Sequence, residues 1–251
     1  MSNDAEKVRE GGLFLFVVML FSLYSFNLRD EGTLMLIVDV ETCGQNPHKS
    51  SIISIGAVYV AKPCSKPEVY YGECRVPTDT FIDPESLAVN GCTLEDIMRA
   101  DKLSLSEALL TFFSWTGSWG MPARLKKSFS YNNSTPLYTI FGHNPDFDRE
   151  FLYHNAKQVG LRSPFGNHVV DLHAVCASTL LRMNEHIPLY KERSALRADT
   201  IFEIVGIGAE PKPHVGWKGA VMTAEAFHRL IYGRYLFEEY KDKSVPRFLR
   251  Y

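Results

Sequence analysis

Apolar residues gather near the start of this 251-residue chain in short runs that predict buried strands. Residues 34–38 form an unbroken apolar run, closed by Thr42 to Gly44, and this pattern is typical of a strand buried on both faces. A run rich in β-branched residues at 51–61 and a third run at 69–76 follow after short connections. The fold is therefore expected to open with a three-stranded antiparallel meander.

Helix-start signals follow the meander. Thr93 with Asp96 and Ser104 with Glu107 each place an acid three residues after a hydroxyl side chain, and the second pair is a capping box. Beyond them, strands are expected at 137–141 and 168–170, and helices at 144–159, 171–183, 195–205 and 215–232. A meander followed by β-α-β alternation predicts an α/β fold with a mixed five-stranded sheet and helices on both faces.

The chain length suits one complete domain, which we place at residues 34–235 with a C-terminal tail at 236–251. Residues 12–26 precede it and are almost continuously apolar, but as a helix they would span only about 22 Å of a roughly 30 Å hydrocarbon core. Three interpretations of the extension 1–33 stay open: a marginal membrane anchor, a helix packed on the domain, and a non-native start. We favour the third because Met35 could itself begin the chain, so a membrane is expected only if 12–26 is a genuine anchor.

Composition narrows the class of protein. A formal net charge of −2 and a pI near 6.5 provide no global basic field, so a phosphate substrate must be met locally by metals and a few Lys or Arg side chains. The five cysteines are scattered, odd in number and form no C-x-x-C pair. This pattern argues against a disulfide framework or a zinc site and favours a reducing, cytoplasmic location.

Two carboxylates, Asp39 and Glu41, come at the end of the first buried strand. On a strand, residues two apart project from the same face and lie roughly 6.5 to 7 Å apart along the chain. Burying two like charges is unfavourable unless a cation lies between them, and a divalent metal is the simplest candidate. The alternative is a strand end that surfaces into a loop with solvated acids, and this pair alone leaves both interpretations open.

A further carboxylate follows the fourth expected strand. Asn144 and Pro145 predict a helix start, and Asp148 falls on the first turn, where the helix dipole favours a negative charge. The simplest interpretation of Asp148 is therefore N-terminal helix electrostatics.

Taken in order, these residues resemble the DEDDh-type (DnaQ-like) 3′→5′ exonucleases of the ribonuclease H-like superfamily. Asp39, Glu41 and Thr42 match the first family motif, Asp-x-Glu-Thr at the end of a central strand. Asn144 and Asp148 match the second motif, in which an Asp follows an Asn by four residues. Several ordered motifs at family-like intervals are a strong signal, whereas each alone would be weak.

The third family motif is incomplete. His214 matches its histidine, but Gly219 stands where the family has an aspartate, and glycine offers no ligand. Glu225 lies about 240° around the helix from position 219 and cannot take its place. Lys218 is interpreted as a solvated lysine, and Glu210 precedes a Pro-Lys-Pro loop whose path the sequence does not determine.

The resemblance implies a metal-dependent 3′→5′ exonuclease that releases nucleoside monophosphates from single-stranded nucleic-acid 3′ ends. It implies two Mg²⁺ or Mn²⁺ ions and no organic cofactor, and the loss at Gly219 predicts weaker occupancy of one metal and slower hydrolysis. The alternative is a catalytically impaired module that binds 3′ ends or a partner protein. By resemblance, the implied roles are metal ligand for Asp39, Glu41 and Asp148, general base for His214, and contact with the terminal nucleotide for Thr42 and Asn144.

Overall fold

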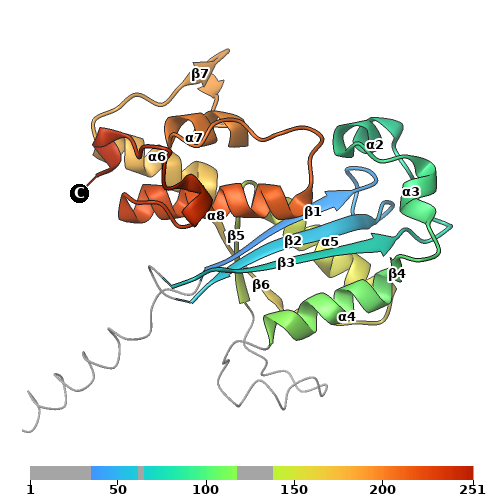
Figure 1. Cartoon of the computed structure of the whole chain (residues 1–251). Coiled ribbons are helices and arrows are strands. Elements are labelled where there is room, and N and C mark those ends of the chain that lie inside the picture. Colours follow the sequence, from blue (N-terminus) through green and yellow to red (C-terminus); the bar gives the residue numbers. More distant parts are fainter. Residues whose placement is uncertain (1–34, 62–64, 118–137, 251) are drawn as a thin grey trace, which may run out of the picture.

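The computed structural model describes residues 35–61, 65–117 and 138–250, which form an α/β fold around a central sheet (Figure 1). The expected extension 1–33, with its apolar segment 12–26, lies outside the described residues. The strands of the central sheet are β1 Met35–Thr42, β2 Ile52–Val60, β3 Glu68–Arg75, β4 Leu103–Ser104, β5 Tyr138–Gly142 and β6 Phe165–Asp171.

The sheet has six strands in the order β4-β3-β2-β1-β5-β6. Strands β1, β2 and β3 pair antiparallel, as the predicted meander requires, while β5 and β6 join β1 in parallel and β4 joins β3 in parallel. The mixed α/β fold predicted from the sequence is therefore confirmed. All five expected strands are present, and the two-residue edge strand β4 adds a sixth that the hydrophobic pattern was too short to indicate.

The helices of the described residues cover both faces of the sheet. They are α2 Pro84–Asn90, α3 Leu94–Met98, α4 Leu105–Thr116, α5 Pro145–Gln158, α6 Leu172–Arg182, α7 Ala198–Ile204 and α8 Gly216–Tyr232, with the short 3-10 turns η1 Glu238–Tyr240 and η2 Arg247–Leu249. Between α6 and α7, a small hairpin pairs β7 Leu189–Tyr190 with β8 Arg193–Ser194. Figure 1 shows α6, α7 and α8 on one side of the sheet and α4 and α5 on the other.

The side chains of β1 alternate between these two layers. Met35 and Ile37 are buried in the cluster formed with α6, α7 and α8. Leu36, Val38 and Val40 are buried in the cluster formed with α4 and α5. A central strand with helices on both sides is apolar on both faces, which is why residues 34–38 read as an unbroken apolar run.

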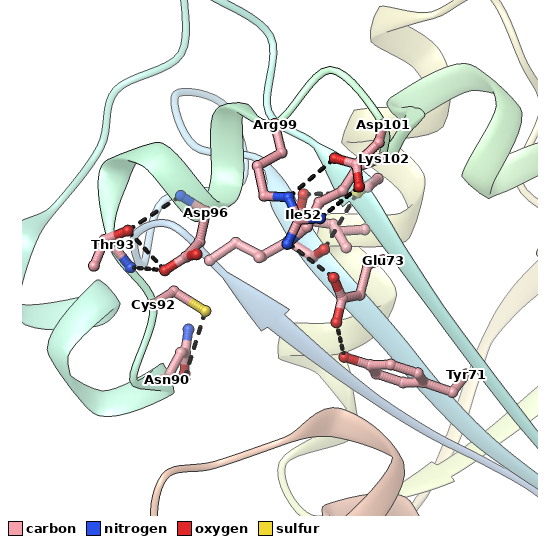
Figure 2. Close-up of polar contacts among 12 residues, drawn as sticks. Ile52, Tyr71, Glu73, Asn90, Cys92, Thr93, Asp96, Arg99, Asp101 and Lys102 are labelled. Carbon is pink, nitrogen blue, oxygen red and sulfur yellow. Dashed lines mark hydrogen bonds and ion pairs between the residues drawn. The ribbon is translucent and has the colours of Figure 1, made fainter.

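Polar contacts join β3 to the connection that leads into β4 (Figure 2). Lys102 Nζ lies 2.8 Å from Glu73 Oε2, and the Tyr71 hydroxyl donates to Glu73 Oε1 at 2.6 Å. At the start of α3, Thr93 Oγ1 accepts from Asp96 N at 3.1 Å, while Asp96 Oδ2 accepts from Thr93 N at 2.8 Å. The predicted capped start at Thr93 is therefore confirmed.

One helix escaped the sequence analysis. The turn that leads into α2 has Asp83 at the N-cap, where its carboxylate accepts from Glu85 N at 3.1 Å, followed by Pro84 at the first helical position. Both are recognised helix-start signals, and they were available in the sequence.

The segment after residue 235 packs on the same core. Leu249 is fully buried, and Leu236 and Phe237 contact the cluster around α8. Among the described helices, none is both long enough and apolar enough to cross a membrane.

Candidate functional site

Asp39 and Glu41 lie near the end of β1, in register with Gly56 and Ser54 of β2. Strand alternation places them on the same face as Met35 and Ile37, the face that α8 covers. The pair therefore points toward the helix that follows His214. Asp39 therefore does not project into a solvated loop, because α8 packs against β1 and β2 at this point.

Asp148 reaches this strand end from the other layer. It lies on the first turn of α5, is 4% exposed, and its Oδ1 accepts a hydrogen bond from Val40 N at 2.8 Å. Strand β5 pairs with β1 only at Leu36 and Ile37, so beyond that point the β1 backbone needs another partner. The Asp148 carboxylate provides this partner, which places it beside Asp39 and Glu41.

Burial dominates the electrostatics of these three acids. It raises the pKa of Asp39 well above its usual range, with the negative charges of Asp148, Glu41 and Glu210 adding to the effect. Burial raises the pKa of Glu41 to about 7, although His214 opposes this rise. Burial also raises the pKa of Asp148 to about 8, against the hydrogen bond from Val40 N. A cluster of carboxylates that raise one another's pKa is one that a cation would stabilise.

His214 approaches the same cluster from the loop before α8. Its Nδ1 lies 3.4 Å from Glu210 Oε2, and its side chain is 32% exposed. The backbone of Glu210 is tied to α7, because its N–H donates to Asp199 Oδ1 at 3.0 Å. Burial raises the pKa of Glu210, with His214 and Lys218 lowering it and Asp199 raising it.

Glu210 is a site residue that sequence reasoning did not place. Its side chain is only 8% exposed, and its Oε1 is buried without a hydrogen-bond partner. A buried, unpartnered carboxylate oxygen is unfavourable unless a ligand completes it. The available signal was its position four residues before His214, as the only acid between Ile204 and Ala224.

Gly219 lies in the first turn of α8, directly over Asp39. A Cβ at position 219 would overlap Asp39 Oδ2, and it would lie 3.1 Å from Asp39 Cγ and 3.4 Å from Glu210 Oε1. The helix comes this close because Gly216 and Gly56 meet backbone to backbone, where a Cβ on Gly56 would overlap Gly216. The missing side chain at 219 thus makes room for the Asp39 carboxylate, with Glu210 Oε1 beside it.

The two expected nucleotide-contacting residues lie at strand ends near this cluster. Thr42 is 7% exposed, and its Oγ1 donates to Gly44 O at 2.7 Å. Asn144 is exposed and adopts a left-handed conformation with φ of 55°. The helix begins after Asn144 as predicted, but the Asn144 side chain makes no capping hydrogen bond, so it is free of that local role.

The structure therefore brings Asp39, Glu41, Asp148, His214 and Glu210 to one end of the sheet. Carboxylate oxygens are the donors that hard divalent cations prefer, and the unpartnered Glu210 Oε1 suits such an ion. Within the described ranges, no three His, Cys, Asp or Glu side chains already surround one point closely enough to hold a metal.

The chain is similar to known nucleases in sequence and in fold. No protein-family model matches the chain. Its sequence is 28% identical over 146 residues to the 3′-5′ DNA exonuclease Cap18 of Escherichia coli, covering 58% of this chain and 68% of that protein.

Solved structures with the same fold are also nucleases. E. coli exonuclease I with single-stranded DNA and a zinc ion matches with a TM-score of 0.57 and 20% identity, covering 80% of this chain and 40% of that one. Cell-death related nuclease 4 matches with a TM-score of 0.60 and 14% identity, covering 80% of this chain and 64% of that one. The chain thus spans less than half the length of exonuclease I. By sequence the chain is similar to a 3′-5′ DNA exonuclease, and its fold is that of exonuclease I and cell-death related nuclease 4.

Proposed function

We propose that this protein is a metal-dependent 3′→5′ exonuclease that removes nucleoside monophosphates from single-stranded nucleic-acid 3′ ends. One observation carries the proposal. Asp39, Glu41, Asp148 and His214 come from three separate parts of the chain, in the order of the family motifs, and the fold gathers them into one electrostatic cluster that is partly to fully buried. A structural core does not need this many acids in one place, whereas phosphodiester hydrolysis does.

Asp39, Glu41 and Asp148 would hold the metal, and Mg²⁺ or Mn²⁺ fits a donor set made of carboxylate oxygens. When bound, such an ion lowers the pKa of a water molecule and neutralises charge that develops on the phosphodiester. The acids themselves position this chemistry. Asp148 is fixed by its hydrogen bond from Val40 N, and Asp39 is confined between β1 and α8.

His214 is proposed as the general base. Its Nδ1 faces Glu210 Oε2, so Nε2 is the nitrogen available to accept a proton from the attacking water. The water oxygen then bonds to phosphorus, and the bond between phosphorus and the 3′ oxygen of the preceding nucleotide breaks. That oxygen leaves with the bonding electron pair and takes a proton from solvent to become a 3′ hydroxyl. The carboxylate of Glu210 stabilises the imidazolium that this transfer creates.

Thr42 and Asn144 are proposed to contact the terminal nucleotide, since both lie near the carboxyl ends of parallel strands beside the acids. The relative Cap18 is named as a DNA exonuclease, and exonuclease I was solved with single-stranded oligonucleotides. Both facts support single-stranded nucleic acid as the substrate class. The alternative, a module that binds 3′ ends without cutting them, would use the same class of nucleic acid.

The test is a nuclease assay of the full chain with end-labelled single-stranded DNA and RNA, in Mn²⁺, Mg²⁺ or EDTA. We expect stepwise shortening from the 3′ end that EDTA or Asp39→Ala abolishes. Equal product from wild type and Asp39→Ala would contradict the proposal. In that case, retained binding to 3′ ends would favour the impaired binding module.

A further inference from the structure

The Asp39 carboxylate occupies the position that a side chain of residue 219 would take, and Glu210 Oε1 lies beside it. Asp39 Cγ lies 3.1 Å, and Glu210 Oε1 lies 3.4 Å, from the point where a Cβ of residue 219 would stand. These acids come from β1 and from the loop between α7 and α8, so only the tertiary structure brings them to the same point. An aspartate at position 219 would begin at this point.

Glu210 is held so that one oxygen remains available. Its Oε2 faces His214 Nδ1 at 3.4 Å, and its backbone is tied to Asp199. Its Oε1 is buried, makes no hydrogen bond and lies 3.4 Å from the Cβ position of residue 219, beside the Asp39 carboxylate. This buried oxygen makes no hydrogen bond, and an ion shared with Asp39 would give it a direct partner.

Glu225, the other acid near position 219 in the sequence, already has partners for both of its carboxylate oxygens. Glu225 Oε1 lies 2.6 Å from Arg229 Nε, and its Oε2 accepts from Leu236 N and Phe237 N at 2.8 and 3.0 Å. Its side chain has no exposure, so it is a structural acid of the C-terminal segment. Of Glu210 and Glu225, therefore, only Glu210 has a buried carboxylate oxygen without a hydrogen-bond partner.

We propose that Glu210 is the fourth carboxylate ligand of this site and binds the cation through Oε1, in place of the aspartate absent at Gly219. This inference rests on the proposed nuclease function, because it concerns the same metal site. With Glu210 as a ligand the site has four carboxylates, so the expectation that one metal is weakly held no longer applies. It also gives Glu210 two contacts, with Oε1 on the cation and Oε2 on His214.

Calorimetric titration with Mn²⁺ tests the proposal on the wild type, Glu210→Gln, Glu210→Ala and Asp39→Ala. We expect both Glu210 variants to bind Mn²⁺ at least about tenfold more weakly than wild type, since even groups outside the ligand shell contribute this much. Glu203→Gln is the matched control, because Glu203 is an exposed acid on α7. Its affinity for Mn²⁺ should equal that of wild type.

Thermal unfolding supplies a second measurement that does not depend on activity. In EDTA, Glu210→Gln should unfold at a higher temperature than wild type because it relieves repulsion with Asp39 and Glu41. Adding Mn²⁺ should then raise its unfolding temperature less than it raises that of wild type. The EDTA scan also shows that the variant is folded.

The outcomes separate this inference from the proposed function. Wild-type Mn²⁺ affinity in both Glu210 variants, with loss in Asp39→Ala, would overturn the ligand role of Glu210 and leave the nuclease proposal standing. Slower cutting or an altered pH profile in Glu210→Gln at unchanged Mn²⁺ affinity would make Glu210 a partner of His214 only, which also overturns it. A wild type that neither binds Mn²⁺ nor cuts would contradict both proposals.

Discussion

Asp148 has two separable duties at the residue scale. Its Oδ1 satisfies Val40 N inside the sheet, and its charge belongs to the carboxylate cluster. Asparagine keeps an acceptor oxygen but removes the charge, whereas alanine removes both. The two substitutions therefore distinguish a structural role from a role in chemistry.

We expect both Asp148→Asn and Asp148→Ala to reduce nuclease activity by about 100-fold or more, since each removes a proposed metal ligand. Only Asp148→Ala leaves Val40 N buried without an acceptor, which costs about 1–3 kcal/mol. In EDTA, urea unfolding should therefore show Asp148→Ala to be less stable than Asp148→Asn. Asp146→Ala, an exposed acid on the same turn, should leave activity unchanged, and an equal loss in that variant would argue against the site.

His228 is a buried base whose protonation should couple to folding. Burial lowers its pKa, with Arg234 adding to this effect, while Glu225 and the hydrogen bond between His228 Nδ1 and Arg234 O oppose it. The ring also lies 4.8 Å from Tyr232, and His228 Nε2 has no hydrogen-bond partner. The folded protein must therefore keep this imidazole neutral at a pH where the unfolded chain would protonate it.

The unfolded chain binds more protons at His228 once the pH falls below the ordinary histidine value of about 6.5. The free energy of unfolding should thus decrease from pH 7 toward pH 5 through this group. His228→Gln should decrease less over this range, as measured by urea unfolding. His186→Gln, at an exposed position, should follow the wild type, and identical slopes for all three proteins would contradict the prediction.

At the element scale, α8 anchors the C-terminal segment through one buried ion pair. Arg229 and Glu225 have no side-chain exposure. Arg229 donates to the carbonyl oxygens of Val205, Tyr240, Lys243 and Ser244, and Glu225 accepts from two backbone N–H groups of the segment. Residues 236–250 are thus part of the folded domain, because the Arg229 and Glu225 side chains form hydrogen bonds with backbone groups of this segment.

We expect Arg229→Ala to lower the free energy of unfolding by about 3–5 kcal/mol, because it leaves Glu225 buried without its cation. Hydrogen exchange in residues 236–250 should become faster at the same time, because the carbonyl oxygens of this segment lose the Arg229 side chain as their hydrogen-bond donor. Arg247→Ala, a matched change at an exposed arginine in η2, should cost less than about 1 kcal/mol. A similar cost for both variants would contradict this account of the segment.

Capping explains why helix starts were predicted well. Ser104 Oγ accepts from Glu107 N at 3.3 Å, and Glu107 Oε2 accepts from Ser104 N at 2.8 Å, as the capping box requires. Such contacts span three residues, so they are written into the sequence locally. Element ends differed by one to three residues where no cap marks them, as at the expected helix 195–205, which is observed as Ala198–Ile204.

At the scale of the whole molecule, one close approach between glycines sets the site. Gly56 on β2 and Gly216 at the start of α8 meet backbone to backbone, which brings α8 against β1. His214 and Gly219 flank this contact on the α8 side, and Asp39 is in register with Gly56. The distance between helix and sheet therefore determines whether these groups form one cluster.

Gly56→Ala should push α8 away from the sheet, because its Cβ would overlap the backbone of Gly216 and Trp217. We expect a loss of about 1–3 kcal/mol in the free energy of unfolding and weaker Mn²⁺ binding. Gly117→Ala is a suitable control, since a Cβ there meets only ordinary contacts at 3.5 and 3.6 Å. A Gly56→Ala protein with wild-type stability and affinity would show that this contact does not position the site.

The sequence by itself determined the local features and the motif order. Alternation and capping predicted the meander, the helix starts and the mixed sheet, because these depend on neighbours a few residues apart. Asp39, Glu41, Asp148 and His214 were selected by their order along the chain, and their roles stay predictions.

Only the tertiary structure decided how the site is completed. The bond between Asp148 and Val40 joins residues 108 positions apart, and the loop that carries Glu210 to Asp39 has no hydrophobic period to reveal its path. Gly219 looked like a lost ligand in the sequence, whereas in the fold its missing side chain makes room for Asp39 beside Glu210, a buried acid with one unpartnered oxygen. Local pattern determines which elements form, but contacts between distant segments depend on how those elements pack, and the approach of Glu210 to Asp39 is such a contact.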